Sequence, residues 1–209
     1  MTESAGPHTH VTSELWNDAR GELDRYVEIL ATRGIEWGLV GPAEAGRLWE
    51  RHVLNSLAIV PFVPPDSAVL DVGSGAGLPG VPLALVRRDV RVTLLEPLLR
   101  RSRFLEQCVA ELGLQGRVNL RRGRAEDERG AYDVVTARAV APLQKLVGWC
   151  APLIAPGGRL VALKGRSAGD ETRAAADELK ARRLTATVHE VSVDGSDGPT
   201  WVVEVFGGR

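Results

Sequence analysis

A chain of 209 residues with 44% hydrophobic and 25% charged residues has the composition of a globular protein with one sizeable core, and it is too short for two large domains. No apolar run approaches the roughly 18 residues that a membrane span needs, so we expect no membrane segment and no membrane partner. The formal net charge of −1 argues against a protein that coats nucleic acid without selectivity, so any RNA contact has to come from a local basic patch.

The first ten residues lack the basic region and apolar core of a secretory signal, so we expect residues 1–10 to be a disordered tail and the protein to be cytoplasmic. Cys108 and Cys150 lie far apart in apolar stretches, without a Cys-x-x-Cys pair or a histidine at metal-ligand spacing nearby. We therefore expect two reduced core cysteines and no metal site.

Residues 11–65 carry two helical patterns and form a predicted N-terminal helical extension. Val11–Arg33 places apolar residues at helical spacing among charged ones, and Gly34 ends the pattern. Ala43–Ile59 shows the same spacing, and the prolines at 61, 64 and 65 stop it.

From residue 66 to 209 short β-rich runs alternate with helical ones, which predicts an α/β domain with a mainly parallel sheet. Seven runs are strand-like: Val69–Val72, Val90–Leu95, Val118–Arg121, Tyr132–Thr136, Arg159–Leu163, Thr185–Val193 and Thr200–Phe206. The link between the last two is too short for a parallel crossover, so we expect a C-terminal antiparallel hairpin on an otherwise Rossmann-like sheet.

A glycine-rich turn follows the first of these runs, in the segment Val69-Leu-Asp-Val-Gly-Ser-Gly-Ala-Gly-Leu-Pro-Gly80. Gly73, Gly75 and Gly77 let backbone N–H groups approach a ligand at the carboxyl edge of the sheet, although a tight turn without a ligand is the alternative. The dinucleotide fingerprint needs glycine where this chain has Leu78, and no Walker loop is present. A ligand with a ribose but no pyrophosphate remains, and S-adenosylmethionine is such a ligand.

Two further strand ends carry candidate cofactor residues. Glu96 lies about twenty residues beyond the glycines, the distance at which such folds place a ribose-binding carboxylate, although a solvated or helix-capping glutamate is the alternative. After the next strand, Ala125 is small enough for a flat ring, and Glu126 could accept a hydrogen bond from an adenine amino group.

Basic residues gather at the same predicted edge. Arg100, Arg101 and Arg103 occupy the first turns of a predicted helix, where the helix dipole disfavours positive charge. Lys164 follows a later strand and extends the rim. We interpret these four side chains as candidate contacts to RNA phosphates, and a solvated face is the alternative reading.

Taken together, five segments resemble the bacterial glucose-inhibited division protein B family: the glycine segment, Leu94–Leu105, Gly123–Glu126, Tyr132–Leu143 and Ala162–Gly165. The resemblance runs from about Trp37 to Gly165 and implies a class I S-adenosylmethionine-dependent methyltransferase that acts on guanine N7 in small-subunit (16S) ribosomal RNA. It further implies ribosomal RNA as partner, within the small subunit or free of it. We expect the protein to act as a monomer.

By this resemblance Gly73 and Leu78 line the S-adenosylmethionine pocket, Ala125 and Glu126 meet its adenine side, and Arg138 completes the site. The family usually carries an Arg-His-x-x-Asp-Ser box before the sheet, which stands here as Arg51–Ser56 with Asn55 in place of the aspartate. Asn55 keeps an acceptor but not the charge. We read His52 within this box either as part of a contact between the extension and the sheet or as a site residue, and not as catalytic.

Two alternatives of other classes stay open: a small-molecule methyltransferase and a non-catalytic RNA-binding module. The first predicts an apolar lid over the mouth of the site, whereas this rim is rich in arginine. We name no catalytic base, because guanine N7 has a free lone pair and no proton to remove. Arg138 is at most a positioning residue.

Overall fold

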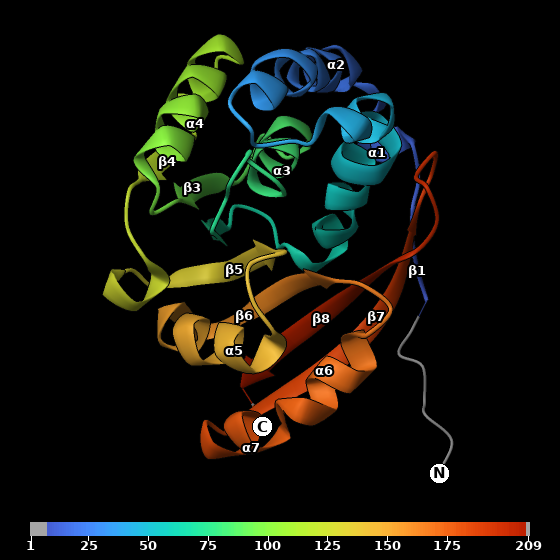
Figure 1. Cartoon of the computed structure of the whole chain (residues 1–209). Helices are drawn as coiled ribbons and strands as arrows, with labels where there is room; N and C mark the ends of the chain where they lie inside the picture. Colours follow the sequence, from blue (N-terminus) through green and yellow to red (C-terminus); the bar gives the residue numbers. More distant parts are fainter. Residues whose placement is uncertain (1–7, 208–209) are drawn as a thin grey trace.

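The computed structural model describes residues 8–207, and a single sheet organises them (Figure 1). Its strands are β1 (Thr9–Val11), β2 (Ala68–Val72), β3 (Arg91–Leu95), β4 (Val118–Arg121), β5 (Tyr132–Arg138), β6 (Ile154–Lys164), β7 (Leu184–Val193) and β8 (Thr200–Gly207). They lie in the order β1-β7-β8-β6-β5-β2-β3-β4. Strands β2 to β6 pair in parallel, and β8 runs antiparallel to both of its neighbours, β6 and β7. The predicted Rossmann-like sheet with its C-terminal hairpin is confirmed.

The eighth strand corrects the prediction of a disordered tail over residues 1–10. Thr9 and His10 belong to β1, which pairs in parallel with the outer edge of β7. The imidazole of His10 contacts Asp194 Oδ1 at 2.9 Å, and the Asp194 N–H donates to the Val11 carbonyl at 3.0 Å. An otherwise open strand edge offers unpaired backbone groups, and this segment satisfies them. Residues 1–7 lie outside the described residues.

Helices cover both faces of the sheet (Figure 1). One face carries α2 (Arg20–Ile29), α3 (Gly80–Val86), α4 (Leu99–Glu111) and the short α1 (Glu14–Asn17), and the other carries α5 (Leu143–Cys150), α6 (Ala168–Ala174) and α7 (Ala176–Ala181). Each face of the sheet packs into its own hydrophobic core, and alternate residues of β2 point into the two cores, Val69 into one and Leu70 into the other. Cys108 and Cys150 are free and buried, one in each core, as predicted.

The N-terminal extension is less regular than predicted. Instead of one helix over Val11–Arg33, α2 continues into a π-helical turn, η1 (Leu30–Gly34). Instead of a helix over Ala43–Ile59, three short turns follow one another: η2 (Pro42–Arg47), η3 (Leu48–Leu54) and η4 (Leu57–Phe62). Side chains compete for the helical hydrogen bonds here, because the carbonyl of His52 accepts from both Ser56 Oγ and the guanidinium of Arg138.

The extension shares its core with one face of the sheet. Leu23, Tyr26, Leu54 and Leu57 are fully buried and pack in the same cluster as Val69 of β2. Two more 3-10 turns, η5 (Ala125–Asp127) and η6 (Ala151–Leu153), connect later elements. Within residues 8–207 no helix has the length and hydropathy that crossing a membrane requires.

Candidate functional site

The glycine loop leaves the carboxyl end of β2 and turns back into α3. Gly73, Gly75 and Gly77 have φ values of 68°, 57° and 103°, a region that side chains other than glycine rarely adopt. A Cβ added at Gly73 would lie 2.8 Å from Val140, whereas one added at Gly75 would meet no atom closer than 3.8 Å. The turn therefore requires glycine for its backbone, and at Gly75 it also faces open space.

Glu96 lies beside this loop, one residue beyond the end of β3. Its side chain is almost fully buried, and its two carboxylate oxygens accept hydrogen bonds from the N–H groups of Gly75 and Leu98, both at 3.0 Å. A carboxylate oxygen accepts more than one hydrogen bond, so both oxygens keep acceptor capacity toward a ligand. Glu96 thus fixes the glycine loop and keeps the acceptors that a ribose hydroxyl needs.

A cleft of about 380 Å³ opens at this edge, within the size range of ligand sites. Its lining residues are Val72, Gly73, Leu95, Glu96, Pro97, Leu98, Arg101, Gly123, Arg124, Ala125, Glu126, Ala139, Val140 and Trp149. Four predicted cofactor residues, Gly73, Glu96, Ala125 and Glu126, come together there. An acidic acceptor, bare backbone and a small residue beside an aromatic ring fit an adenosine group.

The other predicted cofactor residues lie elsewhere. Gly75 reaches the cleft through its hydrogen bond to Glu96. Gly77 faces inward, where an added Cβ would lie 2.7 Å from Val81, and Leu78 packs against the core. Arg138 lines a neighbouring cavity and not the cleft. The roles assigned to these residues stay predictions.

The neighbouring cavity is larger, about 950 Å³, and lies between the extension and the carboxyl ends of β5 and β6. It is lined by Arg47, Glu50, Arg51, Asn55, Arg138, Ala139, Val140, Ala141, Pro142, Leu163, Lys164, Gly165, Arg166, Glu171, Asp197, Gly198, Pro199, Thr200 and Trp201. Ala139 and Val140 line both the cleft and the cavity, so the two spaces meet just after β5.

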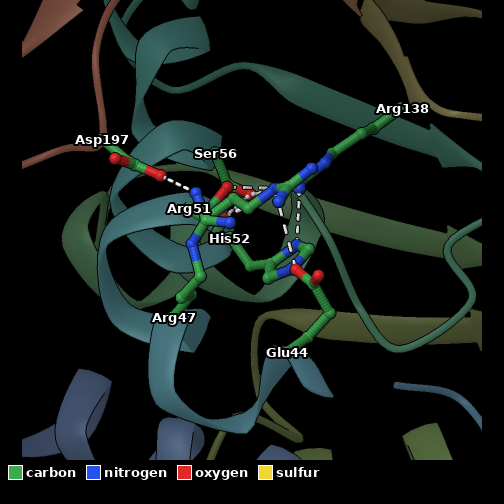
Figure 2. A network of polar contacts seen from close by, with 7 residues as sticks. All are labelled: Glu44, Arg47, Arg51, His52, Ser56, Arg138 and Asp197. Carbon is green, nitrogen blue, oxygen red and sulfur yellow. Dashed lines mark hydrogen bonds and ion pairs between the residues drawn. The ribbon is translucent and has the colours of Figure 1, made fainter. Parts of the chain in front are cut away.

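Arg138 is the most constrained side chain of the cavity wall (Figure 2). Its Nη1 donates to the His52 carbonyl at 2.8 Å and to Ser56 Oγ at 2.9 Å. Its Nη2 contacts His52 Nδ1 at 2.7 Å and the Arg51 carbonyl at 3.4 Å. No carboxylate of residues 8–207 lies within ion-pair distance of it. Burial lowers the pKa of Arg138, although arginine stays charged in proteins.

Glu44 completes this network from η2. Its Oε2 lies 2.8 Å from His52 Nε2, on the ring edge opposite Arg138. Burial lowers the pKa of His52 and outweighs the hydrogen bond to Glu44, which acts in the other direction. Arg47 forms an ion pair with Asp197 in the turn between β7 and β8, also visible in Figure 2. The extension is therefore joined to the sheet by polar contacts at two places on the cavity wall, at Arg138 and at Asp197.

The predicted RNA-contacting residues divide into two groups. Arg100, Arg101 and Arg103 are exposed at the start of α4, and Arg101 lines the cleft. Lys164 lines the cavity, but its side chain is only 8% exposed, and its ammonium donates to the Ala141 carbonyl at 2.8 Å and to Glu171 at 2.7 Å. The three arginines are exposed and can reach phosphates, whereas the ammonium of Lys164 is already paired with the carboxylate of Glu171.

Sequence reasoning missed Tyr26 and Glu44. The fully buried hydroxyl of Tyr26 donates to the carbonyl of Ala76 at 2.8 Å and ties α2 to the glycine loop. Neither residue belongs to a recognisable motif. Tyr26 lies 50 residues along the chain from Ala76, whereas Glu44 lies only eight residues from His52. Trp149 also lines the cleft.

Asp71, at the end of β2, is an unusual buried acid. Its Oδ2 accepts from the N–H of Gly80 at 3.1 Å, whereas Oδ1 has no hydrogen-bond partner. Complete burial, with a smaller effect from Glu96, raises the pKa of Asp71 to about 7. No group of three or more metal-binding side chains occurs among the described residues.

Comparison with known proteins gives matches over most of the chain. Residues 20–196 match the family described as GidB: rRNA small subunit methyltransferase G. A curated protein from Kineococcus radiotolerans, named ribosomal RNA small subunit methyltransferase G, is 50% identical over 200 residues, which cover 94% of this chain and 79% of that protein. A protein of the same name from Thermobifida fusca is 48% identical, with 98% and 87% covered.

Solved structures resemble the fold at much lower identity. A ribosomal protein L11 methylase from Lactobacillus delbrueckii aligns with a TM-score of 0.59 at 17% identity, over 75% of this chain and 77% of that one. The TYW2 protein of P. horikoshii, solved in complex with MeSAdo, aligns with a TM-score of 0.58 at 14% identity, over 74% and 61%. These similarities bear on the fold alone.

The raised pKa of Asp71 predicts how Asp71→Asn changes stability. The folded state holds this proton more tightly than the unfolded state, so the charged carboxylate destabilises the fold above about pH 7, and this penalty disappears as the pH falls toward the ordinary value of 3.8. Above that pH, removing the charge should raise the free energy of unfolding by on the order of 4 kcal/mol. An unpaired amide N–H in the variant should take back about 1–3 kcal/mol of this gain. We expect thermal melts to show a higher Tm than wild type at pH 8 and no advantage at pH 4. An advantage independent of pH would contradict this.

The open space at Gly75 predicts the effect of Gly75→Val on cofactor binding. The new side chain would strain the backbone whose N–H donates to Glu96, so calorimetric binding of S-adenosylmethionine should be lost. Gly113→Val is the matched control, because Gly113 has a φ of 66° and open surroundings at the end of α4. It should lose similar stability and keep cofactor binding. Equal binding by both variants would show that the loop does not hold the ligand.

Proposed function

The chain belongs to the GidB family of small-subunit ribosomal RNA methyltransferases, and from that premise we propose that it transfers a methyl group from S-adenosylmethionine to N7 of a guanine in small-subunit ribosomal RNA. The cofactor occupies the cleft beside Glu96, and the target nucleotide enters the larger cavity. The observation that carries this assignment is the junction of the two spaces at Ala139 and Val140.

S-adenosylmethionine supplies a methyl group on a positively charged sulfur. The protein's own task is to hold and orient: Glu96 accepts from the ribose, the loop at Gly73 to Gly77 brings the backbone close, and Ala125 with Trp149 bounds the adenine side. Guanine N7 has a free lone pair, so no side chain has to remove a proton. Alignment of the reacting atoms is then the main contribution of the chain.

The lining of the larger cavity favours RNA over a small apolar substrate. It carries five basic residues, Arg47, Arg51, Arg138, Lys164 and Arg166, against the three acids Glu50, Glu171 and Asp197. Two of the acids are already paired, with Lys164 and Arg47. A surplus of positive charge at the mouth suits a phosphate backbone. The alternative of a small-molecule methyltransferase, which would call for an apolar cover, is less well supported.

The position of N7 on the base favours an unstacked guanine as the target. N7 lies on the base edge that faces the deep groove of paired RNA, which side chains cannot read. The target base therefore has to leave its helix or lie in a loop, while Arg100, Arg101 and Arg103 hold the flanking phosphates. The protein works as a monomer on ribosomal RNA, within the small subunit or free of it, and hence in the cytoplasm. A purely RNA-binding role would leave the cofactor cleft without a use.

The proposed chemistry predicts the product and its pH dependence. Incubation with S-adenosylmethionine and small-subunit ribosomal RNA should yield N7-methylguanine, located by chemical cleavage at the modified base. The same nucleotide should lack the mark, by mass spectrometry, in ribosomal RNA from cells without the protein. Because no proton is removed, kcat should stay nearly constant above about pH 7. Methylation at carbon or at an exocyclic amine, or a steep rise of the chemical step with one deprotonation, would exclude this mechanism.

The arginines of α4 predict a salt-dependent loss of RNA binding. Replacing Arg100, Arg101 and Arg103 with alanine should reduce the slope of log affinity against log salt by about 0.7–0.9 for each lost phosphate contact. The matched control, with Arg88, Arg91 and Arg182 replaced, removes the same charge from exposed positions at the amino ends of β3 and β7. Cofactor binding should stay unchanged in the control and change little in the α4 variant, in which only Arg101 lines the cleft. If the control lowers the slope as much as the α4 variant, the arginines of α4 are only a solvated face.

A further inference from the structure

The joint between the extension and the sheet depends on Arg138, a half-buried arginine without an ion-pair partner among residues 8–207. Four of the hydrogen bonds of the Arg138 guanidinium go to residues of one short segment: the carbonyls of Arg51 and His52, Ser56 Oγ and His52 Nδ1. All four acceptors are neutral. A positive charge that has lost most of its water therefore depends on every one of these acceptors.

This geometry dictates the proton position on His52. Arginine has only donors, so His52 Nδ1 must accept at 2.7 Å and cannot carry a proton. The single proton of the neutral ring then sits on Nε2, where it is donated to Glu44 Oε2 at 2.8 Å. A second proton on the ring would set two donors against each other at the Arg138 contact.

We propose that His52, oriented by Glu44, is a positioning residue that locks the RNA-facing wall of η3 onto the end of β5 through Arg138, and that this lock requires the neutral imidazole. The inference rests on the proposed function, because it assigns the larger cavity to RNA. Protonation of His52 would release Arg138 and shift Arg51, which lines the same cavity. Arg51, His52, Glu44 and Arg138 lie outside the lining of the cofactor cleft, so cofactor affinity should not follow this change.

Charged groups face His52 from three directions. Glu44 of η2 favours the imidazolium, whereas Arg51 of η3 and Arg138 of β5 disfavour it, as does the partial burial of the ring. The pKa of His52 lies below 6.5 as a result, so the lock is complete at neutral pH and fails on the acid side. Asp71 also interacts with Arg138 and titrates near pH 7, so its contribution has to be separated.

The test is the pH dependence of the KM for small-subunit ribosomal RNA, between about pH 8 and pH 5.5. For wild type we expect the KM to rise about tenfold on the acid side, the size of one lost hydrogen bond to a charged group, with cofactor affinity unchanged. In His52→Asn the amide oxygen can replace Nδ1 as acceptor and cannot be protonated. This variant should recover most of the activity that His52→Ala loses, and it should show no acid rise.

Glu44→Gln gives a directional check. The amide still accepts from Nε2 but no longer favours the imidazolium, so the acid rise should move to lower pH. His189→Asn is the matched control, because His189 is also buried against a carboxylate, that of Glu204 at 3.1 Å, on strand β7. It should keep the wild-type profile. Asp71→Asn should keep the acid rise as well.

Three outcomes would overturn the proposal: an acid rise that persists in His52→Asn, one that disappears in Asp71→Asn, or one that moves to higher pH in Glu44→Gln. Nitrogen NMR of the histidine rings gives a readout that needs no activity. It should show His52 with its proton on Nε2 at neutral pH, and a doubly protonated or Nδ1-protonated ring there would also overturn it. If no variant methylates ribosomal RNA, the proposed function fails, and the NMR result still decides the role of His52.

Discussion

Strand β2 has β3 on one side and β5 on the other, and the three strands run in the same direction. The chain therefore has to leave the end of β2 between two strands whose connections go to opposite halves of the sheet, and a crevice opens at that point. Glycines at the turn, Glu96 after β3 and the segment from Arg138 to Val140 after β5 meet there because of this order alone. The cleft beside Glu96 and the larger cavity lie in the same crevice and share Ala139 and Val140 as lining residues.

The N-terminal extension holds the two sides of this crevice in place. It reaches the glycine loop through the Tyr26 hydroxyl and the strand end through the Arg138 guanidinium, so both sides of the crevice are fixed by the same packed layer. Neither contact is an ion pair. Burying Arg138 against neutral acceptors and Asp71 with an unpaired oxygen destabilises the fold, and charges retained at such a cost are typical of functional sites. The contacts of Arg138 fall on the carbonyls of Arg51 and His52 in η3, and the His52 carbonyl also accepts from the Asn55 N–H and from Ser56 Oγ.

Local patterns predicted most of the fold and placed four of the proposed cofactor residues at one cleft. Strand runs, the hairpin and the carboxyl-edge position of Gly73, Glu96, Ala125 and Glu126 follow from spacing, because a parallel sheet brings all strand ends to one edge. Strand β1 was missed because three residues at an edge carry no periodicity. The partners of Arg138 were missed because 86 residues of chain separate it from His52. The ion pair of Lys164 with Glu171 was missed because it depends on where α6 packs, and no sequence motif indicates that position.

The central claim is that the methyl group is delivered at Val140, which lines both the cleft and the larger cavity. The most direct test is a nuclear Overhauser measurement on the protein saturated with S-adenosylmethionine whose transferable methyl carries ¹³C. The account predicts contacts from that methyl to the side-chain methyls of Val140. Contacts to Trp149 or Leu98 with none to Val140 would place the methyl at the far end of the cleft and contradict the account.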